Sequence, residues 1–129
     1  MKFYIASGFQ NKHAVQHVSQ SLKTNGWIHT YDWTKNERAS SYDMLQEVGE
    51  LEREAVLAAD LLIVLLPGGK GTHIEMGLAL AQRKKIYLVA PDERAWDFDQ
   101  TSTFYHLPEV ERFTGSVEEF IFYMLGDLK

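Results

Sequence analysis

The chain has 129 residues, enough for one domain with a real core, and it contains no cysteine, which excludes disulfides, thiol catalysis and cysteine-ligated zinc. Thirteen basic residues stand against 18 acidic ones, and this balance argues against a nucleic-acid partner. No stretch approaches the roughly 20 apolar residues of a membrane span, and the N-terminal apolar segment is too short for a signal peptide. We therefore expect one soluble, cytoplasmic domain over residues 1–129 that acts on neither nucleic acid nor membrane.

Short apolar runs and helical patterns alternate along the chain. We expect strands at 2–6, 27–33, 60–66 and 85–90, an edge strand near 103–106, and helices at 12–24, 42–59, 73–85 and 116–128. The run DLLIVLL at 60–66 is typical of a central parallel strand that is covered on both faces. Asn11 is a candidate cap for the first helix and Asn25-Gly26 is its stop signal, while Ser116 and Glu119 have the spacing of a capping box.

Each of the first three helical patterns carries an apolar stripe that we expect to face the core. The stripes are Val15, Val18 and Leu22 in the first, Val48, Leu51, Ala55 and Ala58 in the second, and Ile74, Leu78 and Ala81 in the third, with Met76 and Leu80 beside them.

Alternating strands and helices indicate an α/β fold, with a parallel sheet between two layers of helices. A five-stranded flavodoxin-like or Rossmann-like three-layer sandwich suits this length. In that strand order, ligands bind outside the carboxyl ends of the first and third strands. The loops that leave those strands are ASGFQ at 6–10 and PGGKGT at 67–72. We expect the two loops to meet at one crevice.

The second loop resembles a phosphate cradle, because its glycines leave backbone N–H groups accessible at the start of a helix. Lys70 adds a cation and Thr72 a hydroxyl. It is not a Walker A loop, since Lys70 is followed by glycine rather than by Ser or Thr. The candidate substrate-binding residues are Ser7, Gly8, Phe9, Trp33, Gly68, Gly69, Lys70, Gly71, Thr72 and His73.

Glu75 has two readings that the sequence leaves open. Thr72-x-x-Glu75 has the spacing of a capping box, in which each side chain bonds the other residue's backbone N–H. Alternatively, Glu75 points into the crevice, ionised by the helix dipole, as a nucleophile or base. Asp32, at the end of the second expected strand, and Glu52, beside the stripe of the second helix, are candidate acids.

Other polar residues fit ordinary structural roles. Trp33 can stack on a planar base, but a large aromatic is more often part of the core. His13 and His17 lie four residues apart on a helix, yet no third ligand accompanies them, so we expect no metal. Ser7 has no histidine and acid partner in view, which disfavours a serine-hydrolase triad.

The segments FYIASGF, ELEREAVLAAD leading into LLIVLL, and GTHIEMGLALAQRKKIYLV resemble the nucleoside 2-deoxyribosyltransferase-like family over the whole chain. The resemblance implies a flavodoxin-like fold, no cofactor, and a catalytic glutamate in a Glu-hydrophobe-Gly motif, here Glu75-Met76-Gly77. By resemblance, Glu75 attacks C1′ of a ribose or deoxyribose, and water or a second base resolves the glycosyl-enzyme. Glu52 is the position that we match to the family's further acid, which is usually an aspartate.

The loop PGGKGTHIE is also similar to the Pro-Gly-Gly-x-Gly-Thr-x-x-Glu motif of lysine-decarboxylase-like phosphoribohydrolases. Both families break N-glycosidic bonds. Transferases of the first family often carry an acid in this loop where the chain has Gly69 and Lys70, which favours a nucleoside 5′-monophosphate over a nucleoside. The resemblance also implies a homodimer or higher homo-oligomer, with Phe104-Tyr105-His106 as a candidate interface or lid.

Two other functions remain open on the same fold, since a fold does not determine a function. One is a non-catalytic nucleotide-binding or sensor domain, which the capping-box reading of Glu75 fits equally well. The other is an FMN carrier, which is disfavoured because the phosphate-type loop follows the third strand rather than the first.

Overall fold

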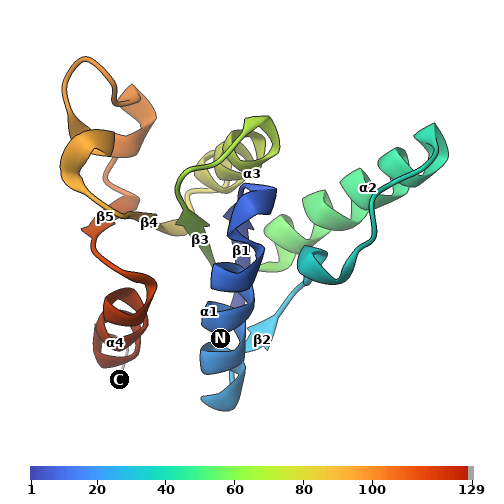
Figure 1. The fold of residues 1–129 in the computed structure, drawn as a ribbon, viewed down its shortest axis with the longest axis horizontal. Coiled ribbons are helices and arrows are strands. Elements are labelled where there is room, and N and C mark those ends of the chain that lie inside the picture. Colours follow the sequence, from blue (N-terminus) through green and yellow to red (C-terminus); the bar gives the residue numbers. More distant parts are fainter. Residues whose placement is uncertain (128–129) are drawn as a thin grey trace.

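A single sheet of five parallel strands organises the chain (Figure 1). The structure, a computed structural model, describes residues 1–127. The strands are β1 (Lys2–Ser7), β2 (Ile28–His29), β3 (Leu61–Leu65), β4 (Lys85–Ala90) and β5 (Val110–Thr114). Their order in the sheet, β2-β1-β3-β4-β5, confirms the predicted flavodoxin-like topology.

Helices cover both faces of this sheet. They are α1 (Lys12–Thr24), α2 (Tyr42–Ala58), α3 (Lys70–Ala81) and α4 (Val117–Asp127). α1 packs with α4 on one face and α2 with α3 on the other, because the chain reverses its direction across the sheet after β2 and crossovers are right-handed. The predicted last helix extends to Leu128, which lies outside the described residues. No helix within residues 1–127 is both long and apolar enough to cross a lipid bilayer.

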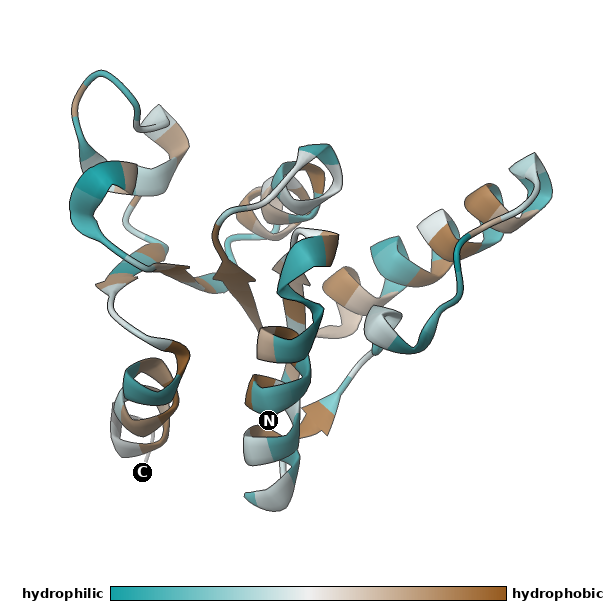
Figure 2. Ribbon diagram, viewed as in Figure 1, coloured by the Kyte–Doolittle hydropathy of each residue, from teal (hydrophilic) through white to brown (hydrophobic). Residues whose placement is uncertain are grey.

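The core lies on the three central strands. All five residues of β3 are buried, which confirms the reading of its aliphatic run as a central strand, and Figure 2 shows this strand in the hydrophobic colour. Val15, Val18 and Leu22 of α1 are fully buried against the sheet, as their spacing predicts. At α4 the predicted capping box is present: the Ser116 N–H donates to Glu119 Oε1 at 2.9 Å, and the Glu119 N–H donates to Ser116 Oγ at 3.1 Å.

Both ends of the sheet differ from the sequence-based expectation. The predicted strand at 27–33 pairs only at Ile28–His29, and the chain then leaves the sheet for a short 3₁₀ helix at Trp33–Lys35. The expected edge strand at 103–106 is a 3₁₀ helix too, begun by the Ser102 hydroxyl, and the edge strand is instead β5. An edge strand needs few buried positions, and in β5 only Val110 is buried, so its apolar pattern is weak.

The apolar stripes of α2 and α3 are also corrected. In α2 only Ala55 and Val56 are buried, and Leu51 is 46% exposed, because the N-terminal part of the helix extends beyond the sheet (Figure 1). In α3 the residues turned to the core are Thr72, Met76 and Ala79, whereas Ile74 is 65% exposed. Glu75, a candidate nucleophile in the sequence, lies between these two faces and is half-buried.

Candidate active site

The loops that follow β1 and β3 meet at the carboxyl end of the sheet, as predicted. The Ser7 hydroxyl donates to the Leu65 carbonyl at 2.7 Å, and the Asn11 amide donates to Ser7 Oγ at 2.9 Å and to the Pro67 carbonyl at 3.2 Å. The Gly8 N–H approaches the same Pro67 carbonyl at 3.4 Å. Asn11 therefore stands at the start of α1 but ties the two loops together rather than capping the helix with its side chain.

The glycine loop ends on the first turn of α3. Gly69 occupies the position before the helix and Lys70 is its first residue, so the N–H groups that open the helix belong to the loop itself. Gly68 is required by a close approach: a Cβ there would lie 2.4 Å from Cγ2 of the buried Thr72. The loop thus presents backbone donors and the positive end of a helix, with Lys70 exposed beside them.

The capping-box reading of Thr72 and Glu75 is wrong. α3 begins at Lys70, so Thr72 is already inside its first turn, and the residue before the helix, Gly69, has no side chain with which to cap it. The Glu75 carboxylate turns instead toward β1. There its Oε2 accepts a hydrogen bond of 2.6 Å from the Tyr4 hydroxyl.

Glu75 is held in a largely desolvated position, which raises its pKa to about 8. Burial is the main cause. The Tyr4 hydrogen bond opposes the rise by favouring the ionised form, and the neighbouring Glu52 adds to it through charge repulsion. The direction of this shift is opposite to the expectation that the helix dipole keeps Glu75 ionised.

Glu52 reaches the same place from α2. Burial raises its pKa, and the nearby Tyr4 hydroxyl lowers it. The single proton of that hydroxyl is donated to Glu75. Tyr4 is itself fully buried, and burial together with the charge of Glu75 raises the pKa of its hydroxyl, which stays protonated as a donor. Two carboxyl groups and one phenol, from α2, α3 and β1, form the polar centre of the crevice.

A cavity of about 460 Å³ opens beside Glu52. Phe9 and Trp33 form part of its wall, together with residues 36–39 and the exposed half of α2. Phe9 is 66% exposed, and its ring centroid lies 6.3 Å from that of Trp33. A flat aromatic group that enters this cavity therefore meets the exposed Phe9 ring and the Glu52 carboxyl group in its wall.

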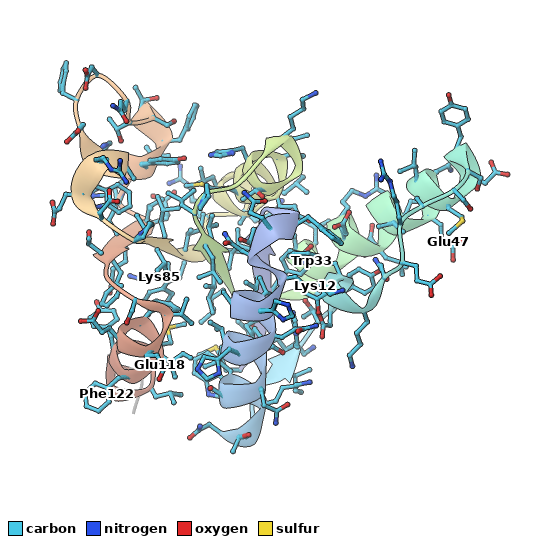
Figure 3. All side chains as sticks on the ribbon, in the orientation of Figure 1. Lys12, Trp33, Glu47, Lys85, Glu118 and Phe122 are labelled. Carbon is cyan, nitrogen blue, oxygen red and sulfur yellow. The ribbon has the colours of Figure 1, made fainter. Side chains whose placement is uncertain are left out.

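Asp32 and Trp33 have structural partners. The Asp32 Oδ1 accepts hydrogen bonds from the Thr34 N–H at 3.0 Å and the Thr34 hydroxyl at 2.5 Å, which caps the short 3₁₀ helix. Trp33 lies between α1 and α2 (Figure 3), with its indole N–H donating to the Ile5 carbonyl at 2.7 Å. Trp33 is only 8% exposed, so it offers the cavity little of its surface.

His73 and Ser7, both predicted to contact substrate, already have hydrogen-bond partners within the chain. The two ring nitrogens of His73 lie 2.8 Å from the Gly69 carbonyl oxygen and 2.7 Å from the Tyr105 hydroxyl. The Ser7 hydroxyl bridges Leu65 and Asn11. The structure therefore gives both side chains a role in holding the loops.

Tyr4 is the site residue that sequence reasoning missed. It lies in the buried strand KFYIA, where it reads as core, and it is indeed fully buried. The available signal was its hydroxyl, because a buried tyrosine O–H normally finds a hydrogen-bond partner. Within residues 1–127, no group of three or more His, Asp or Glu side chains is placed to hold a metal ion.

The arrangement suits chemistry at a carbon atom that develops positive charge. A carboxylate fixed by a phenol can face such a carbon or bond to it, and a second acid with a raised pKa can hold a proton for a leaving group. The loop above them supplies donors for an anion.

Comparison with known proteins agrees with this geometry. The model of the family "Nucleoside 2-deoxyribosyltransferase" matches residues 3–118. Among solved structures, a CMP N-glycosidase of Clostridium botulinum, BcmB, is similar in fold, with a TM-score of 0.71 at 20% identity, covering 96% of this chain and 98% of that one. A conserved protein from Enterococcus faecalis V583 has a TM-score of 0.61 at 20% identity, covering 99% of each chain.

No protein among those with curated functions matches the sequence. The family model, however, spans most of the chain and includes the glycine loop, Glu52 and Glu75. The chain therefore belongs to the nucleoside 2-deoxyribosyltransferase family, whose enzymes act at N-glycosidic bonds.

Proposed function

We propose that this protein cleaves or transfers at the N-glycosidic bond of a nucleoside 5′-monophosphate or nucleoside, with Glu75 as the nucleophile. The observation that carries the proposal is the Glu75 carboxylate, held at 2.6 Å by the Tyr4 hydroxyl beside Glu52. Family membership supports the bond that is broken. The name of the similar structure, CMP N-glycosidase, makes a 5′-monophosphate a reasonable first substrate.

In the proposed reaction the ionised Glu75 attacks C1′ of the sugar as the bond to the base breaks. The transition state resembles an oxocarbenium ion, which a carboxylate stabilises by charge and can trap as a glycosyl ester. Glu52 donates a proton to the departing base, a role that its raised pKa favours. Water or a second base then attacks C1′, releases Glu75 and completes hydrolysis or transfer.

The cavity lined by Phe9 and Trp33 takes the base in this proposal, because it opens directly beside Glu52. The glycine loop and Lys70 take the 5′-phosphate. The distance between loop and acids along α3 is short, since Lys70 and Glu75 lie little more than one helical turn apart. Binding the phosphate would thus place C1′ relative to Glu75 and lower the entropy cost of the reaction.

Base release by Glu75→Gln tests the proposal. Parent and variant are incubated with a panel of nucleosides and 5′-monophosphates that includes CMP, and free base is measured by chromatography. Glutamine keeps the shape and can still accept a hydrogen bond from Tyr4, but it is a far poorer nucleophile, so we expect turnover to fall by several orders of magnitude while ligand affinity changes little. Near-parental turnover by the variant would remove Glu75 as nucleophile.

Lys70→Ala tests the phosphate site separately. We expect it to weaken binding of the 5′-monophosphate by about 1–3 kcal/mol and to leave nucleoside binding nearly unchanged, because only the phosphate offers a negative charge to the ammonium. An equal loss for the two ligands would show that Lys70 does not read the phosphate. A non-catalytic sensor, the alternative from the sequence, would bind ligands in both experiments without releasing base.

The proposal also includes a homodimer or higher homo-oligomer. Apolar side chains are exposed along the outer part of α2, with Leu45 58% and Leu51 46% exposed, and Ile74 of the neighbouring α3 is 65% exposed. Figure 3 shows Glu47 on the same extended part of α2, away from the sheet. A second copy would bury these side chains and close the open side of the cavity. A fully active monomer in light scattering would refute this part.

A further inference from the structure

We propose that His73 and Tyr105 form a latch, meaning a pair of hydrogen-bonded side chains that holds the Gly69–Lys70 peptide with its N–H group facing a bound phosphate. His73 is then a positioning residue rather than a ligand contact. The inference rests on the proposed function, because a 5′-phosphate is the group that this N–H would meet.

His73 bonds the carbonyl group of Gly69 twice. Its backbone N–H donates to that oxygen at 3.2 Å, as expected inside a helix, and its ring Nδ1 lies 2.8 Å from the same oxygen. A carbonyl oxygen only accepts, so Nδ1 carries the proton of the ring. Both lone pairs of the Gly69 oxygen are then used, and its direction is fixed toward the body of α3.

The direction of this carbonyl determines the direction of the next N–H. A trans peptide is planar, and its C=O and N–H groups point to opposite sides. With the Gly69 oxygen drawn toward His73, the N–H of Lys70 must point outward from the start of α3. That is the side on which the glycine loop receives an anion.

The loop needs such a device because its own sequence supplies little rigidity. Gly69 has no side chain to cap the helix, and a Cβ placed there would meet nothing within 4 Å. With Gly68 before it and Gly71 after Lys70, the peptide has a wide choice of conformations in the absence of a ligand. Holding it in the binding orientation removes an entropy cost that the ligand would otherwise meet.

Tyr105 is a fixed anchor for the imidazole. It is 8% exposed, and its hydroxyl lies 2.7 Å from His73 Nε2, with the two rings stacked at a centroid distance of 6.0 Å. Its backbone carbonyl accepts a hydrogen bond of 3.0 Å from Arg112, and its ring meets the Trp96 ring edge-on at 6.1 Å. The ring of His73 is neutral and protonated on Nδ1, so its Nε2 accepts a hydrogen bond from the Tyr105 hydroxyl. This bond orients the ring and therefore also the Nδ1 bond to the Gly69 carbonyl.

Four single variants test the latch, together with the double variant Tyr105→Phe/His73→Ala. Tyr105→Phe removes only the anchoring hydroxyl, His73→Ala removes both bonds of the ring, and His73→Asn keeps a donor near the position of Nδ1. Tyr123→Phe is the matched control. It also removes a tyrosine hydroxyl, but one that donates to Glu111, and Tyr123 belongs to α4, on the face of the sheet opposite to α3. We measure the protection against hydrogen exchange of the backbone amide of residue 73, which donates to the Gly69 carbonyl, without ligand, and binding of ribose 5-phosphate and of ribose by calorimetry.

We expect Tyr105→Phe and His73→Ala to lower the protection of the residue 73 amide and to weaken ribose 5-phosphate binding about tenfold, with ribose binding unchanged. His73→Asn should recover most of the affinity, and the double variant should be no weaker than His73→Ala. The control should match the parent.

Unchanged protection of the residue 73 amide in Tyr105→Phe and His73→Ala would overturn the latch, whatever the ligand. Equal weakening of ribose and ribose 5-phosphate would overturn it too, since a general structural defect predicts that result. A parent protein that binds no ribose 5-phosphate would refute the phosphate site of the proposed function. Lower protection of the residue 73 amide in the variants would then still support the latch as the device that orients the peptide.

Discussion

Replacing Tyr4 by phenylalanine removes the one hydroxyl that hydrogen-bonds Glu75 while keeping the ring that fills the core. The bond is 2.6 Å long and favours the ionised carboxylate, so its loss should raise the pKa of Glu75 further above the value of about 8 that burial produces. A hydrogen bond to a charged group contributes about 1.5–3 kcal/mol. At about 1.4 kcal/mol per pH unit, the pKa of Glu75 should rise by about one to two.

The consequence for the rate follows from the fraction of Glu75 that is ionised. With a pKa of about 8, about a tenth of the free protein has an ionised Glu75 at neutral pH. In Tyr4→Phe this fraction falls about ten- to hundredfold, and we expect kcat/KM at neutral pH to fall with it. At higher pH the ionised fractions of Glu75 in the two proteins converge, so the ratio of the parent rate to the Tyr4→Phe rate should shrink.

The assay is base release at low substrate concentration, from about pH 6 to about pH 10, with the 5′-monophosphate that the parent cleaves. Tyr123→Phe serves as the control for loss of a tyrosine hydroxyl elsewhere. The acidic limb of the profile should move to higher pH in Tyr4→Phe and stay in place in the control. A loss of rate that is equal at every pH would refute the reasoning, since it would show that Tyr4 does not act through the ionisation of Glu75.

Two further predictions concern stability. Because the pKa of Glu75 is raised from 4.5 to about 8, its contribution to the free energy of unfolding is fully present below about pH 4.5 and is lost as the pH rises through 8. In urea unfolding, Glu75→Gln should therefore be more stable than the parent by about 2–5 kcal/mol at pH 9 and nearly equal to it at pH 4. A difference in stability that stays constant with pH would contradict this. Burial lowers the pKa of His29 from 6.5 to about 4. As the pH falls from 6.5 to 4, the free energy of unfolding of the parent should therefore drop by about 2–3 kcal/mol more than that of His29→Gln. Parallel curves of unfolding free energy against pH for the two proteins would count against this prediction.

The His29 prediction depends on a detail of packing. Its Nδ1 lies 2.8 Å from the Ser19 hydroxyl, and its ring stacks on Phe3 with centroids 4.6 Å apart. Among the residues that the structure describes, Nε2 has no hydrogen-bond partner. A proton added there would be buried without an acceptor, which is why the neutral ring is favoured.

Several features of the fold are determined locally and could be read from the sequence. The run at 60–66 is apolar throughout because β3 is covered on both faces, and such a run has few other stable places in a small protein. The capping box of Ser116 and Glu119 forms within one turn, so it needs no distant partner. The alternation of strands and helices, with the right-handed rule, restricts the strand order to very few choices.

The edge strands depended on the rest of the sheet. β5 has a charged pair, Glu111 and Arg112, in its middle, and it is a strand because β4 offers it a free edge. β2 ends at His29 because Trp33 is drawn to the Ile5 carbonyl and Asp32 to Thr34, contacts that no local pattern reveals. Exposed apolar residues on α2 likewise reflect how far the helix extends past the sheet.

For the candidate site, the sequence by itself determined which residues stand at the crevice: a glycine loop after the third strand, and Glu75 one turn into the helix that follows. Only the tertiary structure decided which groups surround Glu75 there. The strand order places β1 beside β3, which brings Tyr4 within 2.6 Å of Glu75 across 71 residues of chain. Burial among β1, α2 and α3 then raises the pKa of Glu75, because desolvation and the charge of Glu52 depend on neighbours in space and leave no mark on the local sequence.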